Sequence, residues 1–156
     1  MKLLLLIIIS IFQLSFIDLN SAMESAGYNA VPLKKNLFGE YILACKINNH
    51  KFEMMVSMGI DQTFIDKIIS DKYEFESTLI ENRDLQLNGD ESQMYAVKVN
   101  EFLIGDIKGN ENEIGAIDFS DFRYLKKLRV EGIIGKSFLI KHEAVIDIAG
   151  DKLFLK

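Results

Sequence analysis

Runs of β-forming residues separated by short turn signals dominate the chain from residue 41 onwards. The segments 41–47 and 50–56 combine apolar and polar positions in the way that half-buried strands do. The pair Asn48-Asn49 lies between them, and asparagine tolerates the positive φ angles of a tight turn. This pattern predicts a β-hairpin over residues 41–56.

A second hairpin is predicted at Asn88-Gly89-Asp90, because Asn-Gly between two apolar runs is the strongest short-range hairpin signal. It joins the predicted strands 85–87 and 94–99. Further short strands are predicted over 63–65, 101–104, 114–118, 130–135, 144–148 and 152–155, and candidate short helices over 67–73, 121–127 and 137–142. Many short strands with regular turns favour an all-β barrel or sandwich with one or two short helices.

The N-terminus has a different character. Lys2 precedes an apolar run, Leu3–Ile17, and small residues follow it, which is typical of a secretory signal peptide cleaved between Ser21 and Ala26. An uncleaved membrane anchor is the alternative, although the run has about 15 residues and a span needs roughly 20. We expect a secreted or periplasmic protein. The chain then divides into a signal peptide (1–22), a lead-in segment (23–35) and one domain (36–156).

Composition and charge narrow the classes of function. The chain has 156 residues and a net charge of −5, with 23 acidic against 18 basic residues. That length suits a single domain, and the acidic balance argues against nucleic-acid binding. One cysteine excludes an internal disulfide and a zinc site built on several thiolates. Two isolated histidines give no metal-ligand spacing, so neither a metal nor another cofactor is expected.

Two segments, in the right order and spacing, resemble the retropepsin-like aspartic protease family. Residues 52–65 are similar to the strand and turn that carry that family's Asp-Thr-Gly motif, and residues 132–139 to the apolar-apolar-Gly element and helix behind it. The closing segments 144–147 and 152–155 are similar to the final hairpin of bacterial members. The resemblance covers residues 36–156 and implies a single-lobe acid-protease closed barrel.

The same resemblance implies positions for the ligand. The Asn88-Gly89 hairpin stands where the family carries a flap over its substrate cleft. Asp61 stands where viral relatives hold an acid that contacts the substrate backbone and supports the dimer. The residues implied to bind a ligand are Asp61, Asn88, Gly89, Asp90, Ile133, Ile134 and Gly135.

The chain departs from the family at the catalytic motif, which reads Ser57-Met58-Gly59. Aspartic proteolysis needs two carboxylates that share one proton, one acting as base on water and the other as acid. A serine hydroxyl does not ionise near neutral pH, and Met58 has no donor to replace the threonine hydroxyl. Gly59 keeps the tight turn. No catalytic residue is therefore intact.

Four further residues of the chain are candidates for other chemistry: Asp61, Ser57, Cys45 and His50. Asp61 is a candidate substitute acid, but its place in the motif favours a supporting role. Ser57 lacks a Gly-x-Ser-x-Gly elbow, and neither His50 nor His142 is placed as its base. Cys45 and His50 flank one hairpin turn and invite a thiol–imidazole interpretation, against which stands a buried cysteine on a strand beside an exposed histidine.

The leading hypothesis is an exported, catalytically inactive pseudoprotease that retains a peptide-binding cleft beneath the flap at residues 88–91. The alternatives are an active aspartic endopeptidase, working as a dimer or with a partner subunit, and a structural exported β-domain. The expected partner is an extended peptide or protein segment, with a possible homodimer or heterodimer. A membrane contact is expected only if the leader stays uncleaved.

Overall fold

A computed structural model describes residues 18–87 and 89–156 of the chain. Most of the predicted signal peptide, residues 1–17, and the flap residue Asn88 lie outside the described residues. The predicted boundary after residue 22 falls inside the first described helix, α2 (Leu19–Ser25). Among the helices of residues 18–87 and 89–156, none has the length and apolar character needed to cross a membrane.

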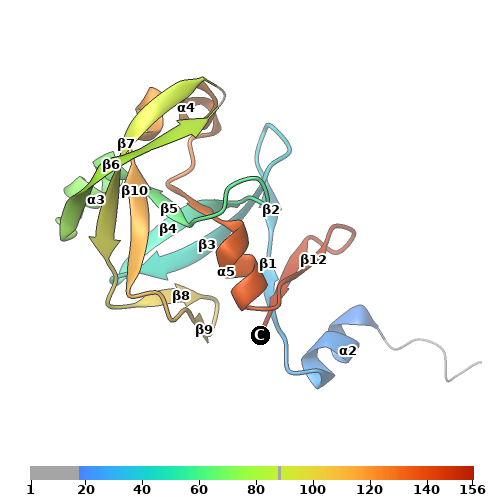
Figure 1. The fold of residues 1–156 in the computed structure, drawn as a ribbon. Coiled ribbons are helices and arrows are strands. Elements are labelled where there is room, and N and C mark those ends of the chain that lie inside the picture. The colour runs from blue at the N-terminus through green and yellow to red at the C-terminus, as the bar shows by residue number, and fades with distance from the viewer. Residues whose placement is uncertain (1–17, 88) are drawn as a thin grey trace, which may run out of the picture.

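Short strands make up most of the described chain (Figure 1). After α2, the elements in chain order are β1 (Asn29–Pro32), β2 (Lys34–Lys35), β3 (Tyr41–Ile47), β4 (His50–Val56), β5 (Phe64–Asp66), α3 (Lys67–Lys72), β6 (Ser77–Leu87), β7 (Asp90–Lys98), β8 (Phe102–Ile104), β9 (Ile107–Lys108), β10 (Glu113–Ile117), the 3₁₀ turn η1 (Phe119–Asp121), α4 (Arg123–Leu128), β11 (Gly132–Ile134), α5 (Lys136–Lys141), β12 (Val145–Asp147) and β13 (Lys152–Leu155). The all-β character predicted from the sequence is confirmed.

The strands form two sheets. The larger has ten strands in the order β6-β7-β10-β5-β11-β4-β3-β8-β9, with β2 on β3, and the smaller has the order β1-β13-β12. The predicted hairpin over 41–56 is confirmed as β3 and β4, and its turn places Asn48 and Asn49 at φ angles of 46° and 71°. The closing hairpin is confirmed as β12 and β13.

The prediction of a closed barrel is wrong, because the larger sheet ends in two strands that do not pair with each other. At one end, β6 and β7 extend together as a long hairpin, which carries β6 away from the body of the sheet (Figure 1). At the other end, β9 has only two residues and pairs with β8 alone. The structure also has more helices than the one or two expected, since α2, α3, α4 and α5 are all present.

Two elements differ from the sequence prediction in detail. β6 begins at Ser77 rather than 85, and its pairing with β7 is interrupted by a bulge between Leu79 and Asp84. The predicted helix over 121–127 is divided into η1 and α4. The carboxylate of Asp118 caps η1 by accepting a 2.8 Å bond from the Ser120 backbone N–H.

Two apolar clusters form the core, and β11 separates them. Alternate strand residues point to opposite faces of a sheet, so Ile133 and Ile134 enter different clusters, and both are fully buried. The first cluster includes Phe52, Phe102 and the β13 residues Leu153 and Leu155. The second gathers side chains from η1 and α4 with residues of β4, β5 and β7. Strands β4 and β5, which pair with β11, likewise send side chains into both clusters, so both of their faces are packed in the core.

Candidate functional site

The loop that joins β4 to β5, residues 57–63, lies against β11 and the start of α5. Three backbone hydrogen bonds hold it there: Ser57 N–H donates to the Ile134 carbonyl at 3.0 Å, Lys136 N–H to Ile60 at 2.8 Å, and Ser137 N–H to Asp61 at 2.9 Å. The two segments that carry the family resemblance, far apart in sequence, are therefore brought into direct contact.

Gly135 and Thr63 explain how closely the segments pack. A Cβ atom at Gly135 would lie 2.3 Å from the Gln62 carbonyl oxygen, so only glycine fits. Its N–H donates to the buried Thr63 hydroxyl at 3.2 Å. Thr63 was not singled out by the sequence analysis as a site residue, although its place at the end of the motif was a usable signal.

The exposed tip of the loop carries no carboxylate at the position of the family's catalytic acid. The Ser57 hydroxyl accepts a 3.3 Å bond from Gly59 N–H, which stabilises the turn. The Met58 side chain is 59% exposed and points away from the core. Asp61 forms an ion pair with Lys136 at 3.2 Å, so its charge is already matched within the chain. The arrangement offers a neutral hydroxyl and a compensated acid, which is no proton-sharing dyad.

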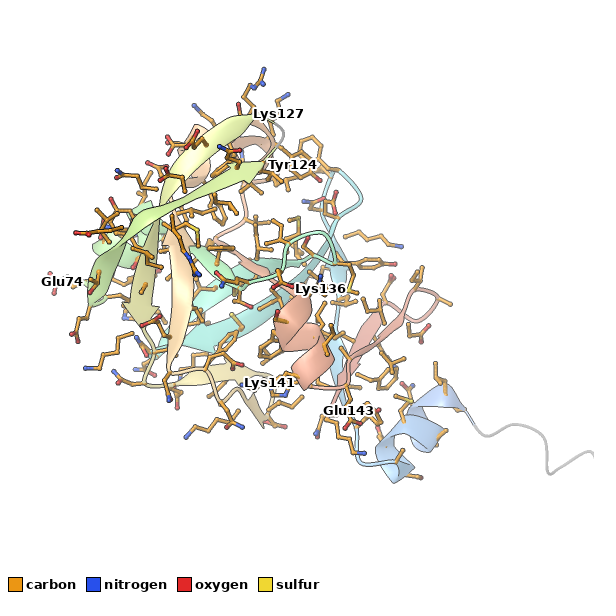
Figure 2. The ribbon with its side chains drawn as sticks, viewed as in Figure 1. Glu74, Tyr124, Lys127, Lys136, Lys141 and Glu143 are labelled. Carbon is orange, nitrogen blue, oxygen red and sulfur yellow. The ribbon has the colours of Figure 1, made fainter. Side chains whose placement is uncertain are left out.

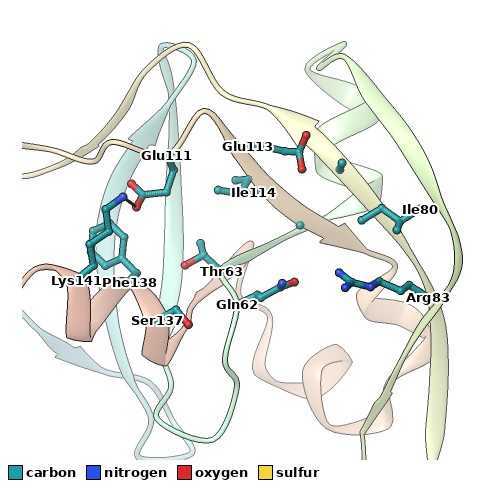
Figure 3. Close-up of a pocket in the computed structure, with 12 residues that line it drawn as sticks. Gln62, Thr63, Ile80, Arg83, Glu111, Glu113, Ile114, Ser137, Phe138 and Lys141 are labelled. Atoms are coloured by element: carbon teal, nitrogen blue, oxygen red, sulfur yellow. Dashed lines mark hydrogen bonds and ion pairs between the residues drawn. The ribbon is translucent and has the colours of Figure 1, made fainter.

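A cleft of about 450 Å³ separates this loop from the β6–β7 hairpin. Ile60, Leu85 and Met94 give it apolar walls, while Asp61 and Arg83 add charge. An adjoining cavity of about 260 Å³ shares Gln62 and Arg83 with the cleft. Figure 3 shows these two side chains pointing toward one another across that cavity. Neither Gln62 nor Arg83 is recognisable as a cleft residue from the sequence, because no local pattern shows that β6 faces the loop.

The other residues implied to bind a ligand occupy different environments. Gly89 takes the positive φ of 83° required by the predicted turn, and Asp90, beside it, contacts α4. Ile133 and Ile134 are fully buried behind the loop. Asn88 lies outside the described residues. The structure thus brings Asp61 to the cleft and Gly135 to the back of the loop.

The alternative chemistries find no geometric support among the described residues. Cys45 is buried with its Sγ 3.0 Å from Met54 Sδ, and burial raises the pKa of its thiol. His50 shares the hairpin face but stacks on Tyr73, with ring centroids 4.0 Å apart. His142 is buried near the Lys156 carbonyl. Both histidines therefore have partners other than the Ser57 hydroxyl.

Comparison with known proteins bears on the fold. No protein-family model matches the chain, and no curated protein matches its sequence. Solved structures do: a retropepsin-like aspartic protease from Rickettsia conorii superposes with a TM-score of 0.60 at 20% identity, covering 81% of this chain and 98% of that one. The retroviral protease-like domain of Ddi1 from Leishmania major gives 0.55 at 13% identity, covering 75% and 88%.

A third similar structure is EIAV protease in complex with the inhibitor HBY-793, with a TM-score of 0.55 at 11% identity, covering 74% of this chain and 99% of that one. Each comparison spans nearly the whole length of a single retropepsin-like lobe. The chain therefore has the single-lobe retropepsin-like fold that the two sequence segments indicated, with an open sheet in place of the closed barrel.

Proposed function

We propose that this chain is an exported, catalytically inactive retropepsin-fold domain that binds an extended peptide segment between loop 57–63 and the β6–β7 hairpin. One observation carries the proposal: the loop keeps its fold and its cleft of about 450 Å³, but presents Ser57 where proteolysis needs an acid. Export rests on the sequence of the leader alone.

The cleft suits an extended segment for two reasons. Strand β6 is an edge of the larger sheet, and an edge offers unpaired backbone groups to an added strand. The walls alternate apolar side chains, such as Leu85 and Met94, with charged ones, such as Arg83. Backbone bonds would supply affinity, and the walls would select side chains.

Absence of hydrolysis follows from the same geometry. A water attacking a peptide bond must lose a proton to a base while the leaving group gains one from an acid. Ser57 keeps its proton near neutral pH, and its hydroxyl accepts a bond from Gly59 N–H. Asp61 is engaged with Lys136. The chain would hold a peptide without cleaving it.

A complete cleft needs a second chain, because one lobe supplies one loop. This chain has two exposed apolar features that could form a dimer interface, a projecting turn and a groove. Leu37 and Phe38 project from a turn fixed by Asn36, whose side-chain oxygen accepts bonds from the Phe38 and Glu40 backbone N–H groups. An apolar groove of about 350 Å³ lies beside Met58 and Ile140, the latter 66% exposed.

In a two-fold dimer the projecting residues of each copy can enter the groove of the other, since an isologous interface uses each surface twice. We therefore propose a homodimer as the form that binds peptide.

Peptide binding is tested by incubating the purified exported protein with a mixed peptide library from about pH 3 to 7, with and without pepstatin. We expect retained peptides and no cleavage. Leu85→Glu, which places a charge in the cleft, should abolish retention. Leu79→Glu is the matched control, because Leu79 lies on the same strand and is already exposed; circular dichroism checks that both variants fold.

Two results would contradict the proposal. Pepstatin-sensitive cleavage that survives removal of contaminating protease would establish an active endopeptidase. Failure to retain any peptide would favour the third hypothesis, a structural β-domain.

A further inference from the structure

One face of β7 contacts the segment 118–125 through three residues, at positions 94, 92 and 90. Met94 is buried against the η1 and α4 side chains of the second core cluster. Ser92, also buried, accepts a 3.3 Å bond on its hydroxyl from the Asp118 backbone N–H. Asp90, whose side chain is 19% exposed, reaches the first residue of α4. Because residues 90, 92 and 94 share a strand face, this part of the hairpin is attached along its length.

The contact made by Asp90 replaces a helix cap. Phe122, which precedes α4, provides no side-chain cap, and the first backbone N–H of the helix, that of Arg123, donates to Asp90 Oδ2 at 3.1 Å. The Arg123 Nε lies 3.3 Å from Asp90 Oδ1. The Arg123 backbone N–H, together with its guanidinium, lowers the pKa of Asp90. The β6–β7 hairpin thus satisfies a donor that α4 itself leaves unpaired.

The next residue of α4 is attached to a different part of the molecule. The Tyr124 hydroxyl donates to Glu40 Oε1, at the end of the turn that presents Leu37 and Phe38. This hydrogen bond raises the pKa of Tyr124 to about 12. Figure 2 shows Tyr124 at the outer end of the hairpin, near that turn. Two neighbouring residues in one helical turn therefore hold the hairpin and loop 36–40.

We infer that loop 36–40 controls how well ordered the β6–β7 hairpin is, and that α4 transmits this effect because it contacts both. We call α4 with these two contacts the bracket. Phe122 and Leu125, which flank Arg123 and Tyr124, are almost wholly buried. This turn of helix therefore cannot move at one contact without disturbing the other. A partner that binds loop 36–40 and fixes its conformation would therefore stabilise the hairpin through α4. In the dimer proposed above, that partner is the second copy.

The link itself does not depend on peptide binding, whereas its role in regulating the cleft rests on the proposed function. By thermodynamic reciprocity, a peptide that orders the hairpin would strengthen dimerisation by the same factor as dimerisation strengthens peptide binding. Variants that break each contact separately measure this coupling directly.

The test compares amide hydrogen exchange in residues 84–87 and 90–93 among four proteins: wild type, Tyr124→Phe, Asp90→Ala and Tyr28→Phe. Tyr124→Phe removes the hydroxyl that bonds Glu40 of loop 36–40. Tyr28→Phe is the matched control, because the Tyr28 hydroxyl also bonds a glutamate, Glu143. We expect Tyr124→Phe to raise exchange in the hairpin by about five-fold, the effect of losing one typical hydrogen bond. Asp90→Ala should raise it at least as much, and Tyr28→Phe should leave it unchanged.

Equal exchange in Tyr124→Phe and Tyr28→Phe would overturn the inference, even if Asp90→Ala raises exchange, because the hairpin would then be capped by α4 but insulated from loop 36–40. Peptide affinity is measured on the same four proteins. If wild type retains no peptide while exchange responds as expected, the proposed function fails and the bracket stands. If peptides bind but exchange does not respond, the reverse holds.

Discussion

Single residues of loop 57–63 determine which chemistry the cleft can perform. Met58 is exposed and Ser57 is half-buried, and neither side chain is part of the apolar core, although the Ser57 hydroxyl accepts a hydrogen bond from Gly59 N–H within the turn. Gly135 is the opposite case, since its missing side chain is what lets the loop lie against β11 and α5. Function and fold therefore depend on different residues of the same site.

Gly135→Ala tests the close packing. The added methyl would collide with the Gln62 backbone, and we expect a loss of about 1–3 kcal/mol in the free energy of unfolding, measured with urea. Gly59→Ala is the matched control, because its Cβ would meet nothing closer than 3.9 Å and its φ is not positive. Equal stability of the two variants would contradict the packing argument.

The short helices show how far local patterns reach at the scale of the element. Lys67–Lys72 was predictable because Asp66 is a recognisable cap, and it does accept a bond from the Ile68 backbone N–H at 3.2 Å. The cap of α4 was not predictable, since its acceptor, Asp90, lies 33 residues away on another element. The length of β6 was not predictable from the sequence for a similar reason, because its partner β7 and the bulge between them determine where it begins and ends.

Asp66 gives a pH prediction for α3. Burial raises the pKa of its carboxyl above the unfolded value of 3.8, against the opposing effect of its backbone hydrogen bonds. The folded state then binds the proton more tightly than the unfolded state, so the burial cost is present at neutral pH. It is relieved as the pH falls through the raised pKa toward 3.8.

Asp66→Asn keeps an acceptor for the Ile68 N–H and removes the buried charge. We expect a higher melting temperature than wild type at pH 7 and a difference that shrinks as the pH approaches 4. Thermal melts at intervals of half a pH unit measure this. A difference that stays constant over the whole range would show that the charge of Asp66 is not its cause.

At the scale of the whole molecule, the proposed peptide-binding form is a homodimer in which loop 36–40 lies at the interface. Leu37→Asp should weaken the proposed dimer by more than about tenfold, because a buried leucine side chain contributes roughly 1.5–3 kcal/mol. Sedimentation equilibrium measures the change. Ile68→Asp is the control, since Ile68 is also an exposed apolar residue but lies on α3, away from loop 36–40 in the sequence. An identical dissociation constant for both variants would exclude loop 36–40 from the interface.

The double variant Ser57→Asp, Met58→Thr tests whether only the catalytic motif has been lost. In a dimer that brings the two loops together it would supply two facing carboxylates, and we then expect pepstatin-sensitive peptide cleavage below about pH 6 where wild type has none. Ser57→Asp alone should gain less, because Met58 lacks the hydroxyl that joins the loops. No gain in either variant would mean that the rest of the cleft no longer fits a scissile peptide.

The sequence by itself determined most of the strands between residues 41 and 155, the turn at Asn48-Asn49 and the order of the two motif segments, because hairpin turns and apolar periodicity are local properties. It also determined the departure at Ser57-Met58-Gly59, which can be read directly from the chain. Only the tertiary structure decided that the sheet stays open, that Arg83 and Gln62 enter the cleft, and that Asp90 caps α4. These features depend on contacts between residues distant in the chain, and their geometry is set by packing rather than by any local pattern.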